Sequence, residues 1–206
     1  MWRSPARRRS NARPEILVFG LGNPGRRYGR TFHNAGFEAV DLLSRSLGIR
    51  LSAGGPVEWG VGEAGGVPVL LGKPATYMNL SGEAVAPLFR KYASDPGDLV
   101  VVHDDLDIAL GIVRLKRGGG TGGHNGLRSL QDALGTPDFL RVRIGIGRPP
   151  GGSDPADYVL SPVPAEIRSR FDAAVAAAAD AVLGILGDGF DKTMTRFNAM
   201  RADSLP

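Results

Sequence analysis

Short apolar runs typical of buried strands alternate along this chain with segments of helical periodicity. Residues 15–19 (EILVF), 99–103 (LVVVH) and 140–147 (LRVRIGIG) have the apolar or alternating pattern of strands in a covered sheet. Between these runs, residues 34–47 and 125–134 place apolar side chains at helical spacing. The alternation predicts a single α/β domain whose mixed, mostly parallel, twisted sheet is covered by helices on both faces.

Glycine pairs and changes of composition mark the remaining elements. The strand-like segments 57–64 and 67–73 flank a Gly-Gly pair, which favours a hairpin turn. An alanine-rich segment over 165–187 predicts a long helix with one apolar stripe. From about Asp191 onward the chain is expected to fray.

The composition limits the compartment and the chemistry. The chain has 206 residues and no cysteine, which fits one domain in a reducing compartment and excludes disulfides and thiolate metal ligands. No run of about eighteen apolar residues is present to span a membrane. The N-terminal residues also lack the apolar stretch of a secretory signal. We therefore expect a cytoplasmic protein that does not bind a membrane.

The net charge of +4 comes from the N-terminal segment. Five arginines lie before Pro14, so the rest of the chain is close to neutral. We expect residues 1–14 to form a disordered arginine-rich tail, residues 15–200 to form the folded domain, and residues 201–206 to fray. A basic arm that contacts nucleic acid is the alternative interpretation of the tail.

The segment GLGNPGRRYGRTFHNAG (20–36) follows the first strand and contains candidate chemistry. Its first six residues match the G-x-G-x-x-G pattern of dinucleotide-binding domains, but helical periodicity begins only near Asn34. A tight turn that presents Asn23 at the end of a strand fits the segment better. His33 lies at a helix start, where the helix dipole would help to keep a catalytic imidazole neutral. A structural histidine is equally consistent with that position.

The acidic segment HDDLD (103–107) follows an apolar run, so Asp104 is expected at the C-terminal end of a buried strand. Spacing alone leaves three interpretations open. The carboxylates would hold magnesium if further ligands came from elsewhere, Asp104 would orient the ring of His33, or the segment would be a solvated acidic turn.

The glycine-rich segment GGGTGGHNG (118–126) follows these carboxylates along the chain. Five glycines precede His124, and Asn125 is expected to cap the helix that comes next. Backbone amides of such a loop can bind phosphate, although the lysine ending of a P-loop is missing.

Several cations surround the glycine-rich segment. Strand alternation places Arg114 with Lys116, and Arg141 with Arg143, on common faces. A phosphate-facing patch and a solvated sheet face are both consistent with this alternation.

Taken in order, five motifs resemble those of bacterial peptidyl-tRNA hydrolases over about residues 15–200: GLGNPG-x₂-Y-x₄-HNAG, KPATYMNLSG, HDDLD, GGGTGGHNG and RVRIGIGRP. The resemblance implies an α/β domain that is monomeric and contains no metal or cofactor. It also implies hydrolysis of the ester between a peptidyl group and the terminal ribose of tRNA, which recycles tRNA from aborted translation. Two positions depart from the family pattern, since Thr121 stands where a histidine is common and Asp105 where a glutamate is common.

The resemblance also implies roles for individual residues. The family's general base corresponds to His33, its orienting carboxylate to Asp104, and the asparagine that helps to favour blocked over free aminoacyl groups to Asn23. Positions that bind substrate or tRNA correspond to Tyr28, Tyr77, Met78, Asn79, Asn125, Lys116 and Arg143. His33 would take a proton from the water that attacks the ester. Peptidyl-tRNA is the expected partner.

Three other functions compete with this interpretation. A tRNA-binding relative without hydrolysis would keep the cleft and show no turnover. A dinucleotide-dependent oxidoreductase built on GLGNPG would bind a nicotinamide cofactor. A metal hydrolase built on HDDLD would lose its activity to a chelator.

Overall fold

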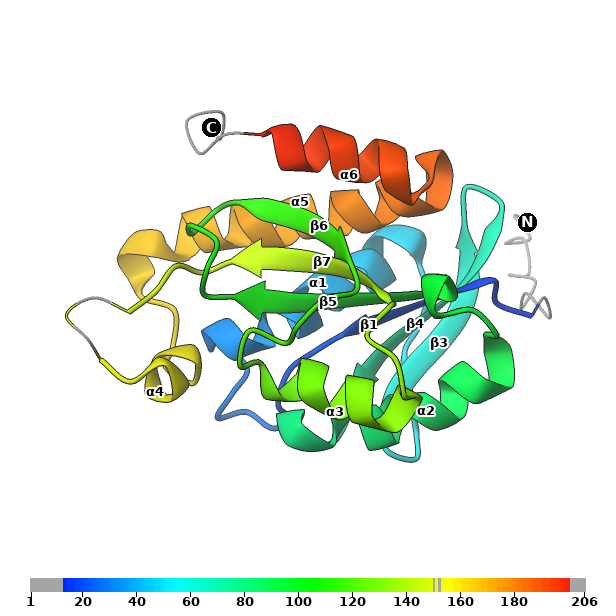
Figure 1. Ribbon diagram of the computed structural model, residues 1–206, viewed down its shortest axis with the longest axis horizontal. Coiled ribbons are helices and arrows are strands. Elements are labelled where there is room, and N and C mark those ends of the chain that lie inside the picture. The colour runs from blue at the N-terminus through cyan, green and yellow to red at the C-terminus, as the bar shows by residue number, and fades with distance from the viewer. Residues whose placement is uncertain (1–12, 150, 152, 201–206) are drawn as a thin grey trace, which may run out of the picture.

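A seven-stranded mixed sheet forms the centre of the computed structural model, which describes residues 13–149, 151 and 153–200 (Figure 1). The strands are β1 (Ile16–Gly20), β2 (Ser52–Gly54), β3 (Val57–Ala64), β4 (Val67–Pro74), β5 (Leu99–Asp105), β6 (Val113–Arg117) and β7 (Leu140–Gly145). The α-helices are α1 (Ala35–Leu47), α2 (Ser81–Tyr92), α3 (Asn125–Leu134), α4 (Pro155–Val159), α5 (Ala165–Asp188) and α6 (Phe190–Ala199). Three 3-10 turns are η1 (Phe32–Asn34), η2 (Met78–Leu80) and η3 (Pro96–Asp98).

The strands lie in the order β2-β3-β4-β1-β5-β7-β6. The four central strands run parallel to one another, whereas β2, β3 and β6 join them in antiparallel pairs at the two sides. The expected α/β domain with a mixed, mostly parallel sheet is confirmed. The predicted hairpin is also confirmed, because β3 and β4 pair across Gly65 and Gly66, which both have positive φ.

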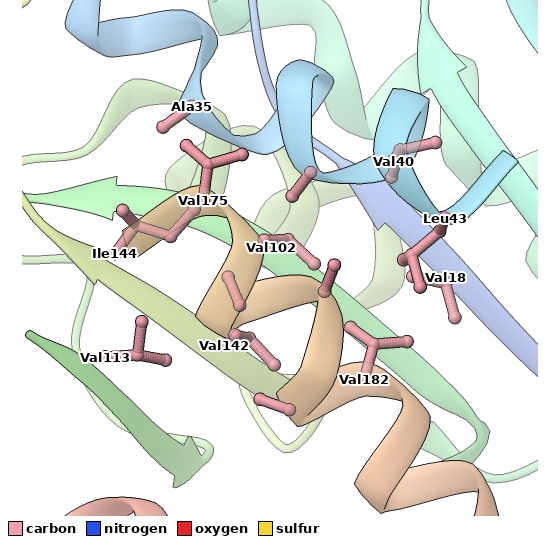
Figure 2. Packing of buried hydrophobic residues seen from close by; sticks show 14 of the residues in the cluster. Val18, Ala35, Val40, Leu43, Val102, Val113, Val142, Ile144, Val175 and Val182 are labelled. Carbon is pink, nitrogen blue, oxygen red and sulfur yellow. The ribbon is translucent and has the colours of Figure 1, made fainter. Parts of the chain in front are cut away.

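Apolar side chains bury both faces of the sheet. On one face, α1 and α5 pack against alternate residues of the central strands, as Figure 2 shows for Val175 and Val182 of α5 beside Val102 and Val142. On the other face, α2 and α3 cover the alternate set, which includes Val101 of β5. This two-sided burial explains why the first part of β5, Leu99–Val102, is apolar at consecutive positions rather than at every second one.

The order of the strands creates a switch point beside β1. The chain leaves β1 through α1 to form β4 on one side, and it returns through α2 to form β5 on the other side. The carboxyl ends of the neighbouring strands β1 and β4 therefore lead to helices on opposite faces of the sheet, α1 and α2, and open α/β sheets bind their ligands beside such a point.

The C-terminal region corrects one expectation, since residues beyond Asp191 do not fray but form α6. Phe197 is buried, and the Asn198 side chain donates to the Leu115 carbonyl (2.9 Å) and accepts from its N–H (2.8 Å). Arg114 donates to the Phe197 and Met200 carbonyls at the end of the same helix. These contacts cover edge strand β6, and the polar sequence of α6 concealed them because they use side-chain amide and guanidinium groups.

Two expectations fall wholly or partly outside the described residues. Of the arginine-rich tail, only its last two residues are described, and the frayed segment 201–206 is not described. Among the described helices, none has the length and apolar character needed to cross a membrane.

Candidate active site

His33 and Asp104 form a buried pair at the switch point. His33 lies in η1, just before α1, and Asp104 is near the end of β5. The His33 Nδ1 atom lies 2.9 Å from Asp104 Oδ1 and 3.1 Å from Oδ2. Because the carboxylate accepts at Nδ1, the proton of the neutral ring lies there and Nε2 carries the free lone pair. Of the three interpretations of HDDLD, the geometry favours the carboxylate that orients His33.

The environment of His33 differs from the one that the helix dipole alone predicts. Burial would lower the pKa of His33, but the charge of Asp104 and the hydrogen bond to it outweigh this effect, so the pKa is raised. Burial likewise opposes ionisation of Asp104, yet His33 and His124 hold the pKa of this carboxyl well below its usual range. The helix dipole was expected only to help keep the ring neutral, and a carboxylate in direct contact acts more strongly than a helix end.

His124 is a second histidine that contacts the same carboxylate, and it was not among the site residues predicted from the sequence. Its Nε2 lies 3.2 Å from Asp104 Oδ1, and its ring centroid lies 4.8 Å from that of His33. Its Nδ1 accepts from the backbone N–H groups of Gly126 and Leu127. His124, rather than Asn125, is thus the N-cap of α3, which corrects the expected cap. Its position between the glycines and the helix was the only sequence signal for this role.

The same three side chains form the one described group of histidine and carboxylate residues close enough to share a metal ion. Their ligand atoms lie within 4.8 Å of one another. However, the cap assigns the lone pair of His124 to Nδ1 and the proton to Nε2, the atom that faces Asp104. A metal ligand must present a lone pair at that atom, so the arrangement fits a hydrogen-bonded array better than a metal site.

Asn23 is held by its neighbours with its amide group in a defined orientation. The Asn34 side chain accepts from the Asn23 N–H (2.8 Å) and donates to its carbonyl (3.0 Å), so Asn34 does not use its side chain as a helix cap. The Met78 N–H donates to Asn23 Oδ1 (2.8 Å). The oxygen of the carboxamide is thereby engaged, and its NH₂ group remains the donor that can face a ligand.

A cleft of about 660 Å³ joins most of the predicted site residues. Its walls include Asn23, Tyr28, His33, Tyr77, Met78, Asn79, Asp104 and Asn125. The two tyrosine rings meet edge to face, with centroids 6.5 Å apart, and Tyr77 is 59% exposed. Such exposed rings offer stacking surfaces at the mouth of the cleft.

Lys116 and Arg143 lie outside this cleft. They line a separate groove of about 490 Å³ between β6 and α6, together with Arg114 and Arg117. Arg143 also forms an ion pair with Asp105 (2.8 Å). Two of the predicted binding residues thus form a basic groove beside the cleft rather than part of its wall.

Arg141 fits neither interpretation of the paired cations, since it is part of neither a phosphate-facing patch nor a solvated sheet face. It is buried, and its guanidinium donates to the carbonyls of Gly119 and Gly120 (2.7 Å each) and of Pro137 (3.3 Å). Strand alternation correctly placed Arg141 and Arg143 on one face, but it cannot show that the glycine-rich loop covers the first of them.

His103 is the third histidine of the site, and the sequence gave no reason to select it. Its Nδ1 lies 2.7 Å from the Asp104 carbonyl, and its ring packs edge to face on His124 at 5.0 Å. Burial and the neighbouring His124 hold the pKa of His103 well below its usual value. His103 is therefore a neutral packing partner beneath the two histidines that contact Asp104.

Comparisons with known proteins show the family of this chain. The sequence pattern of the family described as Peptidyl-tRNA hydrolase matches residues 17–204. The chain belongs to the peptidyl-tRNA hydrolase family. A peptidyl-tRNA hydrolase of Rhodococcus jostii is 50% identical over 186 residues, which cover 88% of this chain and 97% of the relative. A peptidyl-tRNA hydrolase of Mycobacterium tuberculosis is 47% identical over 186 residues, which cover 89% of this chain and 97% of the relative.

Solved structures of this family share the fold. The crystal structure of the Acinetobacter baumannii peptidyl-tRNA hydrolase superposes with a TM-score of 0.84 at 39% identity, covering 90% of this chain and 95% of that one. A crystal structure of a peptidyl-tRNA hydrolase in complex with N-propanol gives a TM-score of 0.85 at 39% identity. The superposition covers 91% of this chain and 96% of that one. The resemblance seen in the motifs and the expected hydrolase class are both confirmed.

Proposed function

We propose that this protein hydrolyses the ester bond between the peptidyl group and the terminal ribose of peptidyl-tRNA, with His33 as the general base. The observation that carries the proposal is the buried His33–Asp104 pair, in which Nδ1 of His33 faces the carboxylate and the ring forms part of the cleft wall. Membership of the family gives the substrate class. Of the competing functions, the oxidoreductase is the least supported, because no helix begins at the third glycine of GLGNPG.

In the first step, His33 Nε2 takes a proton from a water molecule as the water oxygen attacks the ester carbonyl. The imidazolium that forms is stabilised by Asp104, which also holds the ring in the productive tautomer. The raised pKa of His33 makes the ring a stronger proton acceptor than an isolated histidine. His33 then returns the proton to the departing ribose oxygen, so the ester is split into a carboxylic acid and a ribose hydroxyl.

Amide donors would stabilise the negative charge that develops on the ester oxygen. The Asn23 NH₂ group is suited to this role because its carboxamide oxygen is already bound to the Met78 N–H. Asn79 and Asn125 line the same cleft and would contact substrate or position the water. One donor of this kind contributes about 3 kcal/mol to transition-state stabilisation.

Recognition of the tRNA would use the mouth of the cleft and the basic groove. Tyr28 and Tyr77 offer rings on which the terminal bases would stack, and Met78 lines the same cleft. Lys116 and Arg143 would contact backbone phosphate from the groove. We further propose that the protein acts as a monomer in the cytoplasm and needs no cofactor.

The test compares two substrates that differ in one group. The purified protein is incubated with N-acetyl-aminoacyl-tRNA and with the matched free aminoacyl-tRNA, each with and without EDTA. Chelator-resistant release of the blocked amino acid alone is expected. No release from either substrate would favour a tRNA-binding relative, and loss of activity with EDTA would favour the metal hydrolase.

A further inference from the structure

The buried guanidinium of Arg141 has no carboxylate partner. Within the described chain, no carboxylate lies at ion-pair distance from it, and Asp105 pairs with Arg143 instead. Its three partners are backbone carbonyls of the glycine-rich loop and of Pro137. Asp105 and Asp138 favour the charge of Arg141 only from a distance, and the direct partners of the guanidinium are carbonyl oxygens. Because a buried guanidinium needs such partners, Arg141 fixes the carbonyls of the loop in place.

Arg141 also determines which way the loop presents its amides. In a trans peptide, the carbonyl of one residue and the N–H of the next point in opposite directions. Since the carbonyls of Gly119 and Gly120 point inward to Arg141, the N–H groups of Gly120 and Thr121 point outward. No described protein group accepts from either of these two N–H groups, which we call the amide pair. Successive N–H groups on one side of a loop form an anion-binding concavity.

Lys116 lies directly beside the amide pair. A Cβ atom at Gly119 would come within 2.6 Å of Lys116 Nζ, so the ammonium group rests against this glycine. Gly119 also has a φ of 92°, a conformation that a side chain would strain. Gly119 and Gly120 are solvent-exposed, and Thr121 forms part of the cleft wall. The amide pair thus lies where the cleft meets the basic groove.

We propose that the amide pair, with Lys116 beside it, binds a backbone phosphate of the tRNA acceptor end, and that Arg141 is the residue that positions it. The inference rests on the proposed function for the identity of the ligand. The amide pair would supply neutral donors in addition to the cations of the groove. Because these donors are neutral, they release no counterion when phosphate binds, unlike Lys116.

A matched pair of variants separates the amide from the rest of the loop. Gly120→Pro removes one N–H of the amide pair, whereas Gly120→Ala keeps it and adds a Cβ that meets nothing within 4 Å. Affinity for uncharged tRNA is measured by fluorescence anisotropy across a salt series. Gly120→Pro should weaken binding about tenfold with an unchanged salt slope, and Gly120→Ala should lose far less. Equal affinities of the two variants would overturn the proposal.

A second substitution tests the positioning role. Arg141→Lys keeps the charge but replaces the planar guanidinium, whose two terminal nitrogens span the three carbonyls, with a single ammonium nitrogen. It should raise KM for N-acetyl-aminoacyl-tRNA about tenfold and leave kcat within about threefold, because the His33–Asp104 pair is untouched. Arg170→Ala, an exposed charge change on α5, serves as the control. A fall in kcat with unchanged KM would contradict the positioning role.

The native protein provides a readout that does not depend on any variant. In ¹⁵N-labelled protein, the amide resonances of Gly120 and Thr121 should shift downfield when an acceptor-stem minihelix RNA is added, while that of Gly65 in the distant hairpin turn stays in place. Unshifted Gly120 and Thr121 resonances on saturation would overturn the inference. Failure of the wild-type protein to release a blocked amino acid would instead refute the proposed function, so the two failures are distinguishable.

Discussion

Two clusters of ionisable side chains lie on either side of the glycine-rich loop and differ in how their charges are compensated. Around Asp104, a buried carboxylate accepts from two histidines, so its charge is matched inside the protein. Around Arg141 and Lys116, no described carboxylate lies at ion-pair distance, and the loop turns its carbonyls toward Arg141 and two amide donors outward. The first cluster is complete without a ligand, which suits chemistry, whereas the second offers free donors to an anion, which suits binding.

Asp104→Asn removes the carboxylate that contacts His33 and His124, and it should have the largest effect on kcat. The amide cannot stabilise an imidazolium, and it presents an NH₂ group or a weak acceptor to two ring nitrogens. We expect kcat to fall by about a hundredfold or more with tRNA affinity nearly unchanged. Asp132→Asn, an exposed carboxylate on α3, is the control. Equal losses in kcat and tRNA affinity would show that Asp104 serves binding as well.

The pH dependence of kcat/KM tests whether Asp104 sets the pKa of His33. The base form of His33 is the neutral ring, and Asp104 raises its pKa, so the acid limb of kcat/KM should lie above 6.5 in the native protein. Without the carboxylate, burial dominates and lowers the pKa of His33, so the acid limb of Asp104→Asn should move to lower pH. An acid limb at the same pH in both proteins would mean that another group titrates.

His124 tests whether the second partner of Asp104 matters. His124→Asn retains a good N-cap but loses the Nε2 donor, so kcat should fall about tenfold with little loss of stability. His124→Ala should show the same kcat as His124→Asn. It should also lose about 1 kcal/mol of unfolding free energy, because the helix cap is missing. Chemical denaturation and steady-state kinetics measure the two effects. Wild-type turnover in His124→Asn would limit this residue to capping.

Arg143→Ala weakens the binding cluster and should have a smaller effect. Affinity for tRNA should fall several-fold, and the slope of log affinity against log salt should flatten by about one, because one phosphate-contacting cation is lost. Arg143 is held by Asp105, so Asp105→Asn should change the salt slope much less. A slope of native steepness in Arg143→Ala would argue against the phosphate contact.

Asn198→Ala should have the smallest effect on function. Its two hydrogen bonds to Leu115 join α6 to the edge of the sheet, outside the cleft that contains His33. We expect a loss of about 1–2 kcal/mol of unfolding free energy with native kcat at low temperature. A fall in kcat without loss of stability would link α6 to the active site.

The sequence predicted the framework of the site better than its contacts. Strand-like runs and turn residues placed Asn23 and Asp104 at the carboxyl ends of strands, because these patterns are local. The second histidine on Asp104 and the inward course of Arg141 depend on how a distant loop folds over the sheet. α6 was missed because polar side chains, rather than an apolar stripe, attach it to the edge strand.

Side-by-side kinetics and tRNA binding of His33→Ala test the division between chemistry and binding most directly. The variant removes the proton acceptor and leaves the groove and the glycine-rich loop intact. A fall in kcat of at least about a hundredfold, with affinity for uncharged tRNA within about twofold of native, is the expected result. Undiminished turnover in the variant would show that His33 is not the base and contradict the mechanism.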